Sequence, residues 1–138
     1  MNVFIDTNIL IDFFEGRKPF VTEATAIFSL AFNKEITIYC SALSYSNIFY
    51  LLAKSQGKIK AKQALKDIRQ LVHTVTVDTT IIDRALENEQ PDFEDNIQLE
   101  CALLVKNIQS LITRNSKDFK TKNITIQTPK EFLDTYNY

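Results

Sequence analysis

Three aspartates in this sequence fall where their carboxylates could act together. Asp6 ends a short apolar run, and Asp118 closely follows another. Asp95 lies in the first turn of the expected helix between these runs. Carboxylates brought together repel one another unless a cation neutralises them. Hard oxygen ligands of this kind favour Mg²⁺ or Mn²⁺, and such ions assist displacement at phosphoryl centres. The three acids therefore indicate metal-assisted phosphoryl chemistry.

Each acid also has a simpler structural explanation. Asp6 has the residue type and position of a helix N-cap. Asp92, Glu94 and Asp95 could complement the dipole at the start of one helix. Asp118 could be a solvated loop residue. Residue type alone leaves these alternatives open, and the sequence around all three acids together favours a shared site.

Apolar and amphipathic runs alternate along the chain. We expect strands at residues 3–5, 35–40, 74–77, 110–113 and 124–126. We expect helices at residues 9–14, from Pro19, from Ser41 or Ser44 to Gly57, and at 58–72, 79–89, 94–106 and from Pro129. This order predicts an α/β fold, a three-layer domain with a parallel sheet of four or five strands flanked by helices. The three aspartates should then meet at the carboxyl edge of the sheet.

Length and composition fit one domain spanning residues 1–138. Hydrophobic residues make up 45% and charged residues 24%, as in ordinary globular proteins. The sequence has no apolar run long enough to span a membrane and no secretion signal, so a cytoplasmic location is expected. The distant Cys40 and Cys101 suggest free buried thiols rather than metal ligands. His73 is the only histidine, which leaves no histidine pair or zinc cluster.

The segments around the three acids resemble motifs of the PIN domain family. Val3-Phe-Ile-Asp-Thr-Asn-Ile-Leu-Ile-Asp12 looks like its opening motif, with Asp6 at the first acidic position. Asp92-Phe-Glu-Asp95 looks like the third motif, and Leu111-Ile-Thr-Arg-Asn-Ser-Lys-Asp118-Phe119 looks like the fourth. Residues 127–133 are similar to the usual C-terminal strand and helix start. The resemblance spans nearly the whole chain and implies a PIN-like fold.

This resemblance implies a metal-dependent endoribonuclease, often the VapC-like toxin of a toxin–antitoxin pair. RNA would be the substrate, an antitoxin protein would be a partner, and Mg²⁺ or Mn²⁺ would be the cofactor. Asp6, Asp95 and Asp118 would be the catalytic, metal-binding carboxylates. The supporting residues would be Thr7, Asn8, Asn47, Asp92, Glu94, Thr113 and Asn115.

One position departs from the common PIN pattern. Most PIN nucleases carry a glutamate early in the helix after the second strand, where this chain has Asn47. The segment resembles a subgroup with Ser/Thr-Asn-Ile at this point. Asparagine offers one neutral oxygen where glutamate offers a charged pair, so metal affinity should fall. Glu94 or Asp92 could supply the missing charge. The alternative function is a weak or inactive PIN-like module that binds RNA or protein.

The net charge of −1 predicts no broad basic surface, so RNA contacts must be local. Arg114 and Lys117 are the expected RNA contacts, and Lys120 and Lys122 also lie close to Asp118 in the sequence. A second basic run, residues 54–69, is interpreted as a solvated face in preference to an RNA-binding stripe. The many aromatic residues are expected in the core, or in a contact that forms a homodimer.

Overall fold

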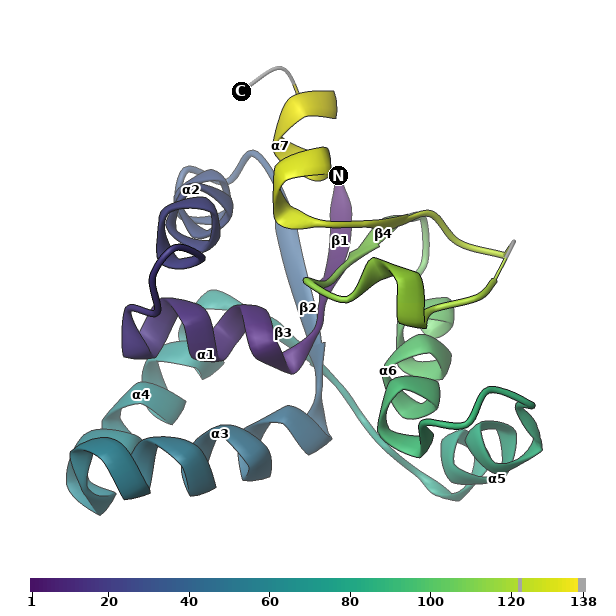
Figure 1. The fold of residues 1–138 in the computed structure, drawn as a ribbon, viewed down its shortest axis with the longest axis horizontal. Coiled ribbons are helices and arrows are strands. Elements are labelled where there is room, and N and C mark those ends of the chain that lie inside the picture. The colour runs from purple at the N-terminus through teal and green to yellow at the C-terminus, as the bar shows by residue number, and fades with distance from the viewer. Residues whose placement is uncertain (122, 137–138) are drawn as a thin grey trace.

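Five parallel strands form one sheet in the order β3-β2-β1-β4-β5 (Figure 1). The computed structural model describes residues 1–121 and 123–136; Lys122 lies outside this range. The strands are β1 (Asn2–Ile5), β2 (Thr37–Ser41), β3 (His73–Val75), β4 (Ile108–Ile112) and β5 (Ile126–Gln127). The expected parallel α/β fold is therefore confirmed.

The first strand of the chain lies at the centre of the sheet. Val3, Phe4 and Ile5 are fully buried, as expected for a strand covered on both faces. Because side chains alternate along a strand, Val3 and Ile5 join one hydrophobic cluster and Phe4 joins the other. β1 pairs with β2 on one side and with β4 on the other. The residue that follows β1 is thus held at the middle of the carboxyl edge.

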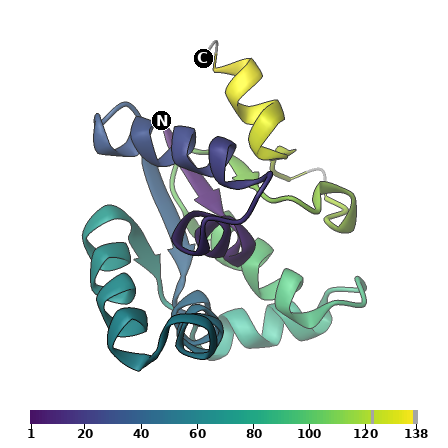
Figure 2. The same ribbon diagram turned by 60° about the vertical axis from the view of Figure 1, so that its left-hand side comes forward.

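Helices cover both faces of the sheet (Figures 1 and 2). One core cluster contains buried side chains of α1, α2, α3, α4 and α7, and the other contains those of α5 and α6. The helices are α1 (Thr7–Glu15), α2 (Val21–Phe32), α3 (Ala42–Gln56), α4 (Lys58–Leu71), α5 (Thr79–Glu87), α6 (Phe93–Leu104) and α7 (Pro129–Thr135). A short 3₁₀ helix, η1 (Ser116–Asp118), follows β4. The three-layer prediction is confirmed.

Several element boundaries differ from the sequence-based expectation. The second helix begins at Val21 rather than Pro19, because Pro19 lies in the turn before it. The third strand includes His73, which was expected to precede it, and ends at Val75. The fifth strand is Ile126–Gln127 rather than residues 124–126, since Ile124 packs into the core as part of a loop. Local patterns predict element types better than element ends.

Two further expectations concern side chains and membranes. Cys40 and Cys101 are both free and buried, as predicted. Burial raises the pKa of each thiol to about 12, so neither is a reactive thiolate at neutral pH. His73 is exposed on an edge strand. Among the described residues, none of the helices is both long enough and apolar enough to cross a lipid bilayer.

Candidate active site

Asp6 lies between the end of β1 and the start of α1, with its side chain 6% exposed. Its backbone N–H donates to the carbonyl of Ile112 at 2.9 Å, which ties it to the neighbouring strand. Oδ1 accepts the Thr7 backbone N–H at 2.7 Å, and Oδ2 accepts the Thr113 hydroxyl at 2.8 Å. Asp6 is therefore a helix cap and also a carboxylate held in one orientation at the carboxyl edge.

The electrostatics of Asp6 combine opposing effects. Burial, the largest effect, raises the pKa of its carboxyl above the ordinary value. The hydrogen bonds from Thr113 and Thr7 and the charge of Arg114 oppose this shift, and the charge of Asp92 adds to it. The raised pKa means that the favourable contacts of the ionised carboxylate do not fully offset the cost of burying its charge.

A buried network of polar side chains surrounds Thr7, the residue that follows Asp6. The Thr7 hydroxyl lies 2.7 Å from that of Ser44 on α3, and Gln98 of α6 donates to it at 3.1 Å. Asn8 donates to Oδ2 of Asp6 at a longer 3.4 Å. Sequence reasoning identified Thr7 and Asn8 but missed Ser44 and Gln98. Polar residues within amphipathic helices ordinarily read as surface positions, so the sequence carried no clear signal for their burial.

The start of α6 brings three acids toward Asp6. Asp92 caps the helix, accepting the Asp95 backbone N–H at 2.9 Å. Burial and then the charges of Asp6, Asp92, Asp118 and Glu94 raise the pKa of Asp95 to about 7. Burial and the charges of Asp6 and Asp92 also raise the pKa of Glu94. The acids predicted from separate motifs therefore repel one another within one electrostatic site.

Asn47 faces this site from the first turns of α3. Its side-chain amide donates a 3.2 Å hydrogen bond to Oε1 of Glu94, which opposes the rise in the Glu94 pKa. Asn47 thus lies beside a carboxylate of α6, where the sequence predicted a supporting residue. A neutral amide at this position avoids the repulsion that a further carboxylate would add.

The loop after β4 contributes the remaining predicted residues. Thr113 is fully buried and bonds Asp6, and its hydroxyl also accepts the Asn115 backbone N–H at 3.2 Å. Asp118, at the end of η1, is exposed, and its charge contributes to the raised pKa of Asp95. Lys117 is exposed on the same turn. Arg114 instead forms an ion pair with Asp12 of α1.

A groove of about 980 Å³ opens beside the acids. Asp92, Asp95 and Asp118 line it together with Lys117 and Lys120. It therefore offers both the acidic groups and the positive charge that a phosphodiester would meet. The residues of the second basic run, Lys54, Lys58, Lys60, Lys62, Lys66 and Arg69, are instead exposed on α3 and α4.

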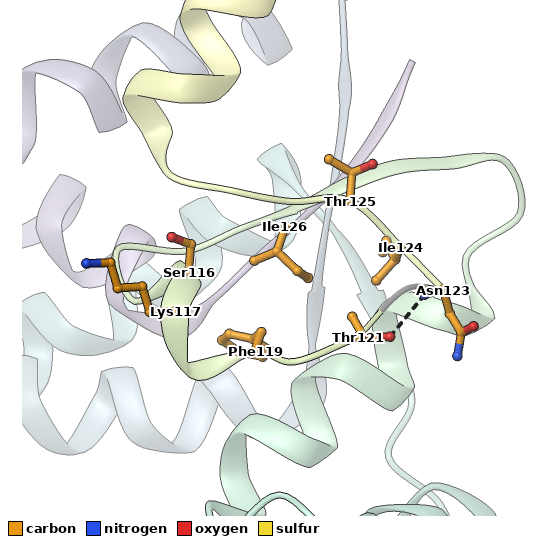
Figure 3. A pocket seen from close by; sticks show the side chains of 8 residues that line it. All are labelled: Ser116, Lys117, Phe119, Thr121, Asn123, Ile124, Thr125 and Ile126. Atoms are coloured by element: carbon orange, nitrogen blue, oxygen red, sulfur yellow. Dashed lines mark hydrogen bonds between the residues drawn. The ribbon is translucent and has the colours of Figure 1, made fainter.

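Gln90 fixes two walls of this groove to each other. Its Nε2 donates to the Lys120 carbonyl at 3.1 Å, and its Oε1 accepts the Lys120 backbone N–H at 3.0 Å. These bonds join the loop before α6 to the segment after η1. A second hollow of about 580 Å³ lies between η1 and β5 (Figure 3) and shares Lys117, Thr121 and Asn123 with the groove. Sequence reasoning did not identify Gln90.

The oxygen ligands of the site are of the type that a hard divalent cation prefers, but among the described residues they do not form a complete coordination shell. The carboxylates supply hard oxygens, and burial together with neighbouring acids raises the pKa of both Asp6 and Asp95, a shift that a bound cation would oppose. Within residues 1–121 and 123–136, no group of three or more Asp, Glu, His or Cys side chains is arranged to hold a metal ion. Mg²⁺ commonly binds through one or two carboxylates together with water and substrate phosphates. The few carboxylates of this site are compatible with that mode of Mg²⁺ binding.

Comparison with known proteins places this geometry in context. Residues 2–117 match the PIN domain family. The chain is 25% identical over 143 residues to ribonuclease VapC1 of Aquifex aeolicus (strain VF5), covering 98% of this chain and 95% of that protein. The fold is similar to a toxin–antitoxin complex from Klebsiella pneumoniae, at 26% identity and TM-score 0.64, covering 92% of this chain and 97% of that one. It is also similar to VapBC2 from Rickettsia felis bound to a promoter DNA fragment, at 19% identity and TM-score 0.68, covering 93% and 98%.

Proposed function

Because this chain belongs to the PIN domain family, we propose that it is a metal-dependent endoribonuclease with its active centre around Asp6, Asp95 and Asp118. The observation that carries the proposal is the raised pKa of Asp95, about 7, which comes first from burial and then from the charges of Asp6, Asp92, Asp118 and Glu94 around it. Carboxylates whose pKa is raised by burial together with specific neighbouring charges, beside a groove, are typical of functional sites. The similarity to a ribonuclease supports RNA as the substrate.

Each residue has a defined part in this proposal. Asp6, Asp95 and Asp118 would hold Mg²⁺ or Mn²⁺, which when bound would activate water and neutralise charge on the scissile phosphate. Thr113 keeps the Asp6 carboxylate in one orientation through its 2.8 Å hydrogen bond. Lys117, exposed beside the groove, would attract the RNA backbone by neutralising phosphate charge.

The alternative function is a PIN-like module that binds RNA or protein without cutting. One observation favours it: Asn47 donates a neutral amide to Glu94 at 3.2 Å, where a fourth carboxylate would strengthen metal binding. Such a module would still bind RNA through the groove. Cleavage rather than binding therefore separates the two functions.

A cleavage assay tests the proposal. The protein is incubated with single-stranded and structured RNA, with Mn²⁺, with Mg²⁺ and with EDTA. We expect cleavage that requires the metal and is abolished by Asp6→Asn. Asp83→Asn, which removes an exposed carboxylate of α5, is the matched control and should cleave like wild type. Binding without cleavage would favour the module, and cleavage that persists in Asp6→Asn would refute the proposed chemistry.

We also propose an antitoxin protein as a partner. The support is that the similar chains include a toxin–antitoxin complex and VapBC complexes. Expression of this chain in a bacterial host should then arrest growth, and expression of Asp6→Asn should not. Normal growth with the wild-type chain, at the same protein level, would count against a toxin role.

A further inference from the structure

Arg114 lies between two residues of the candidate site but its side chain points elsewhere. Its Nε is 2.8 Å from Oδ2 of Asp12, and its guanidinium lies over the ring of Phe20, 4.2 Å from the centroid. Asp12 is 1% exposed, whereas the Arg114 side chain is 25% exposed. The arginine therefore reaches from the loop after β4 into the packing around α1. It does not line the groove, although its charge still lowers the pKa of Asp6.

The ion pair between Arg114 and Asp12 is important for the stability of the fold. Burial raises the pKa of Asp12, and the charge of Arg114 is the main influence in the opposite direction. Within the described residues, neither oxygen of Asp12 accepts a well-formed hydrogen bond, so the ion pair is its principal compensation. A buried carboxylate that loses its cation is strongly destabilised. The buried charge of Asp12 therefore holds the Arg114 side chain in place.

The main chain on either side of Arg114 belongs to the site. The Thr113 hydroxyl donates to Asp6, and the Asn115 N–H donates back to that hydroxyl. Asp6 caps the same helix, α1, that carries Asp12. The segment 113–115 consequently contacts α1 at two points. Thr113 bonds Asp6 at the N-terminus of the helix, and Arg114 pairs with Asp12 farther along it. Movement of Arg114 would shift Thr113 and so the carboxylate that it orients.

We propose that Arg114 is a positioning residue that fixes the Asp6 carboxylate through Asp12, and that it makes no contact with RNA. This inference rests on the proposed nuclease function for its kinetic readout. A small displacement of a reacting group lowers the rate at saturation without weakening substrate binding. Arg114 therefore affects kcat, whereas Lys117, which faces the groove, affects KM.

The first experiment separates positioning from phosphate contact. Arg114→Ala should lower kcat by about 10- to 100-fold with KM unchanged, and Arg114→Lys should restore part of the loss. RNA affinity is then measured against salt concentration in the Asp6→Asn background, where RNA stays intact. Lys117→Ala should reduce the slope of log affinity against log salt by about 0.7, and Arg114→Ala should leave it unchanged. A reduced slope in Arg114→Ala would overturn the proposal.

A charge-matched double variant removes the effect of global destabilisation. Asp12→Asn combined with Arg114→Gln leaves no unpaired buried charge, so its thermal stability should exceed that of Arg114→Ala. We expect the kcat loss to persist in the double variant because the grip on α1 is still absent. Recovery of wild-type kcat together with stability would show that Arg114 serves only the fold, and would overturn the proposal.

Hydrogen exchange gives a readout that does not depend on activity. Arg114→Ala should increase deuterium uptake in a peptide spanning residues 113–119, with uptake in α5 unchanged. Unchanged uptake in residues 113–119 would refute the proposed grip whether or not the chain cuts RNA. If the wild-type chain cuts no RNA, the nuclease proposal fails separately, and the exchange result still decides whether Arg114 holds this segment.

Discussion

The side-chain amide of Asn47 on α3 donates a 3.2 Å hydrogen bond to Oε1 of Glu94 on α6. This contact joins two helices across the acidic site, and it puts a neutral group beside a carboxylate whose pKa is already raised. The acidic site therefore has one charge fewer than a glutamate at residue 47 would give it. The relationship makes Asn47 a position where a charge can be added directly beside Glu94.

Asn47→Glu should make the metal-free protein less stable and its metal affinity higher. The added carboxylate would repel Glu94 in the absence of metal and would supply an anionic ligand in its presence. Metal at 100 times its dissociation constant stabilises the folded state by about 2.7 kcal/mol, so the melting temperature reports binding. Thermal melts over a Mn²⁺ titration should show a lower midpoint concentration in the variant.

Asn47→Gln is the control for this substitution because it changes side-chain length without adding charge. Its Mn²⁺ midpoint should not fall below that of wild type. An Asn47→Glu midpoint equal to wild type would mean that residue 47 does not act on the metal.

Thr113→Val should destabilise the fold and suppress cleavage. The substitution keeps the buried shape but leaves Oδ2 of Asp6 without its 2.8 Å donor. The remaining side-chain donor to Oδ2, the Asn8 amide, is at a longer 3.4 Å. Loss of the Thr113 bond should therefore cost about 1–3 kcal/mol, measurable as a lower free energy of unfolding in urea. Thr22→Val, at an exposed position of α2, is the control and should stay within about 0.5 kcal/mol of wild type. Wild-type cleavage by Thr113→Val would show that this hydrogen bond does not orient Asp6 for the reaction.

Asp95 should make the metal-free protein less stable as the pH rises. Its folded-state pKa of about 7 lies above the value of about 3.9 expected when unfolded. The folded state therefore binds the proton more tightly, and its stability falls between about pH 4 and pH 7. Burial of Asp95 is the largest cause of the raised pKa, and the charges of Asp6, Asp92, Asp118 and Glu94 add to it.

Asp95→Asn removes this titration, so unfolding free energies measured in EDTA separate the contribution of Asp95 from the rest. The variant should gain stability relative to wild type as the pH rises to about 7, with little further gain above it. Parallel curves for the two proteins across this range would contradict a raised Asp95 pKa.

Gln90→Ala should weaken RNA processing with little loss of stability. The variant loses both hydrogen bonds to the Lys120 backbone, at 3.1 Å and 3.0 Å, which join two walls of the groove. We expect a higher KM for RNA and a melting temperature close to wild type, because these bonds lie at an exposed edge. Gln63→Ala, which removes an exposed glutamine that bonds Asp67 within α4, is the matched control. Equal KM values in both variants would remove Gln90 from substrate binding.

The sequence predicted the alternation of strands and helices because buried strands and amphipathic helices have distinct apolar periods. It also placed Asp6 at a strand end, since Val3-Phe4-Ile5 stops abruptly there. The order of the strands in the sheet could not be predicted from the sequence in the same way. That β1 lies between β2 and β4 depends on long-range pairing, and no local pattern encodes which strands become neighbours.

The directions of individual polar side chains were the least predictable part of the site. Arg114 was expected to contact RNA because it lies close to Asp118 in sequence, yet its side chain pairs with Asp12. Asp12 and Gln98 are polar residues on helices and gave no sign of burial. Their burial follows from how α1 and α6 dock on the sheet, which is decided by the sum of apolar contacts rather than by either residue.

The central place of β1 sets the order in which this site can be completed during synthesis. Asp6 is made before β4, but its hydroxyl donor is Thr113 and its backbone acceptor is Ile112. Until β4 has left the ribosome, β1 has β2 as its neighbour and an open edge on the other side. An interrupted chain that ends before β4 therefore keeps the bonds from Thr7 and Asn8 to Asp6 but lacks the contacts with Ile112 and Thr113. A truncated copy of this protein would expose an unpaired strand edge and would lack the assembled acidic site.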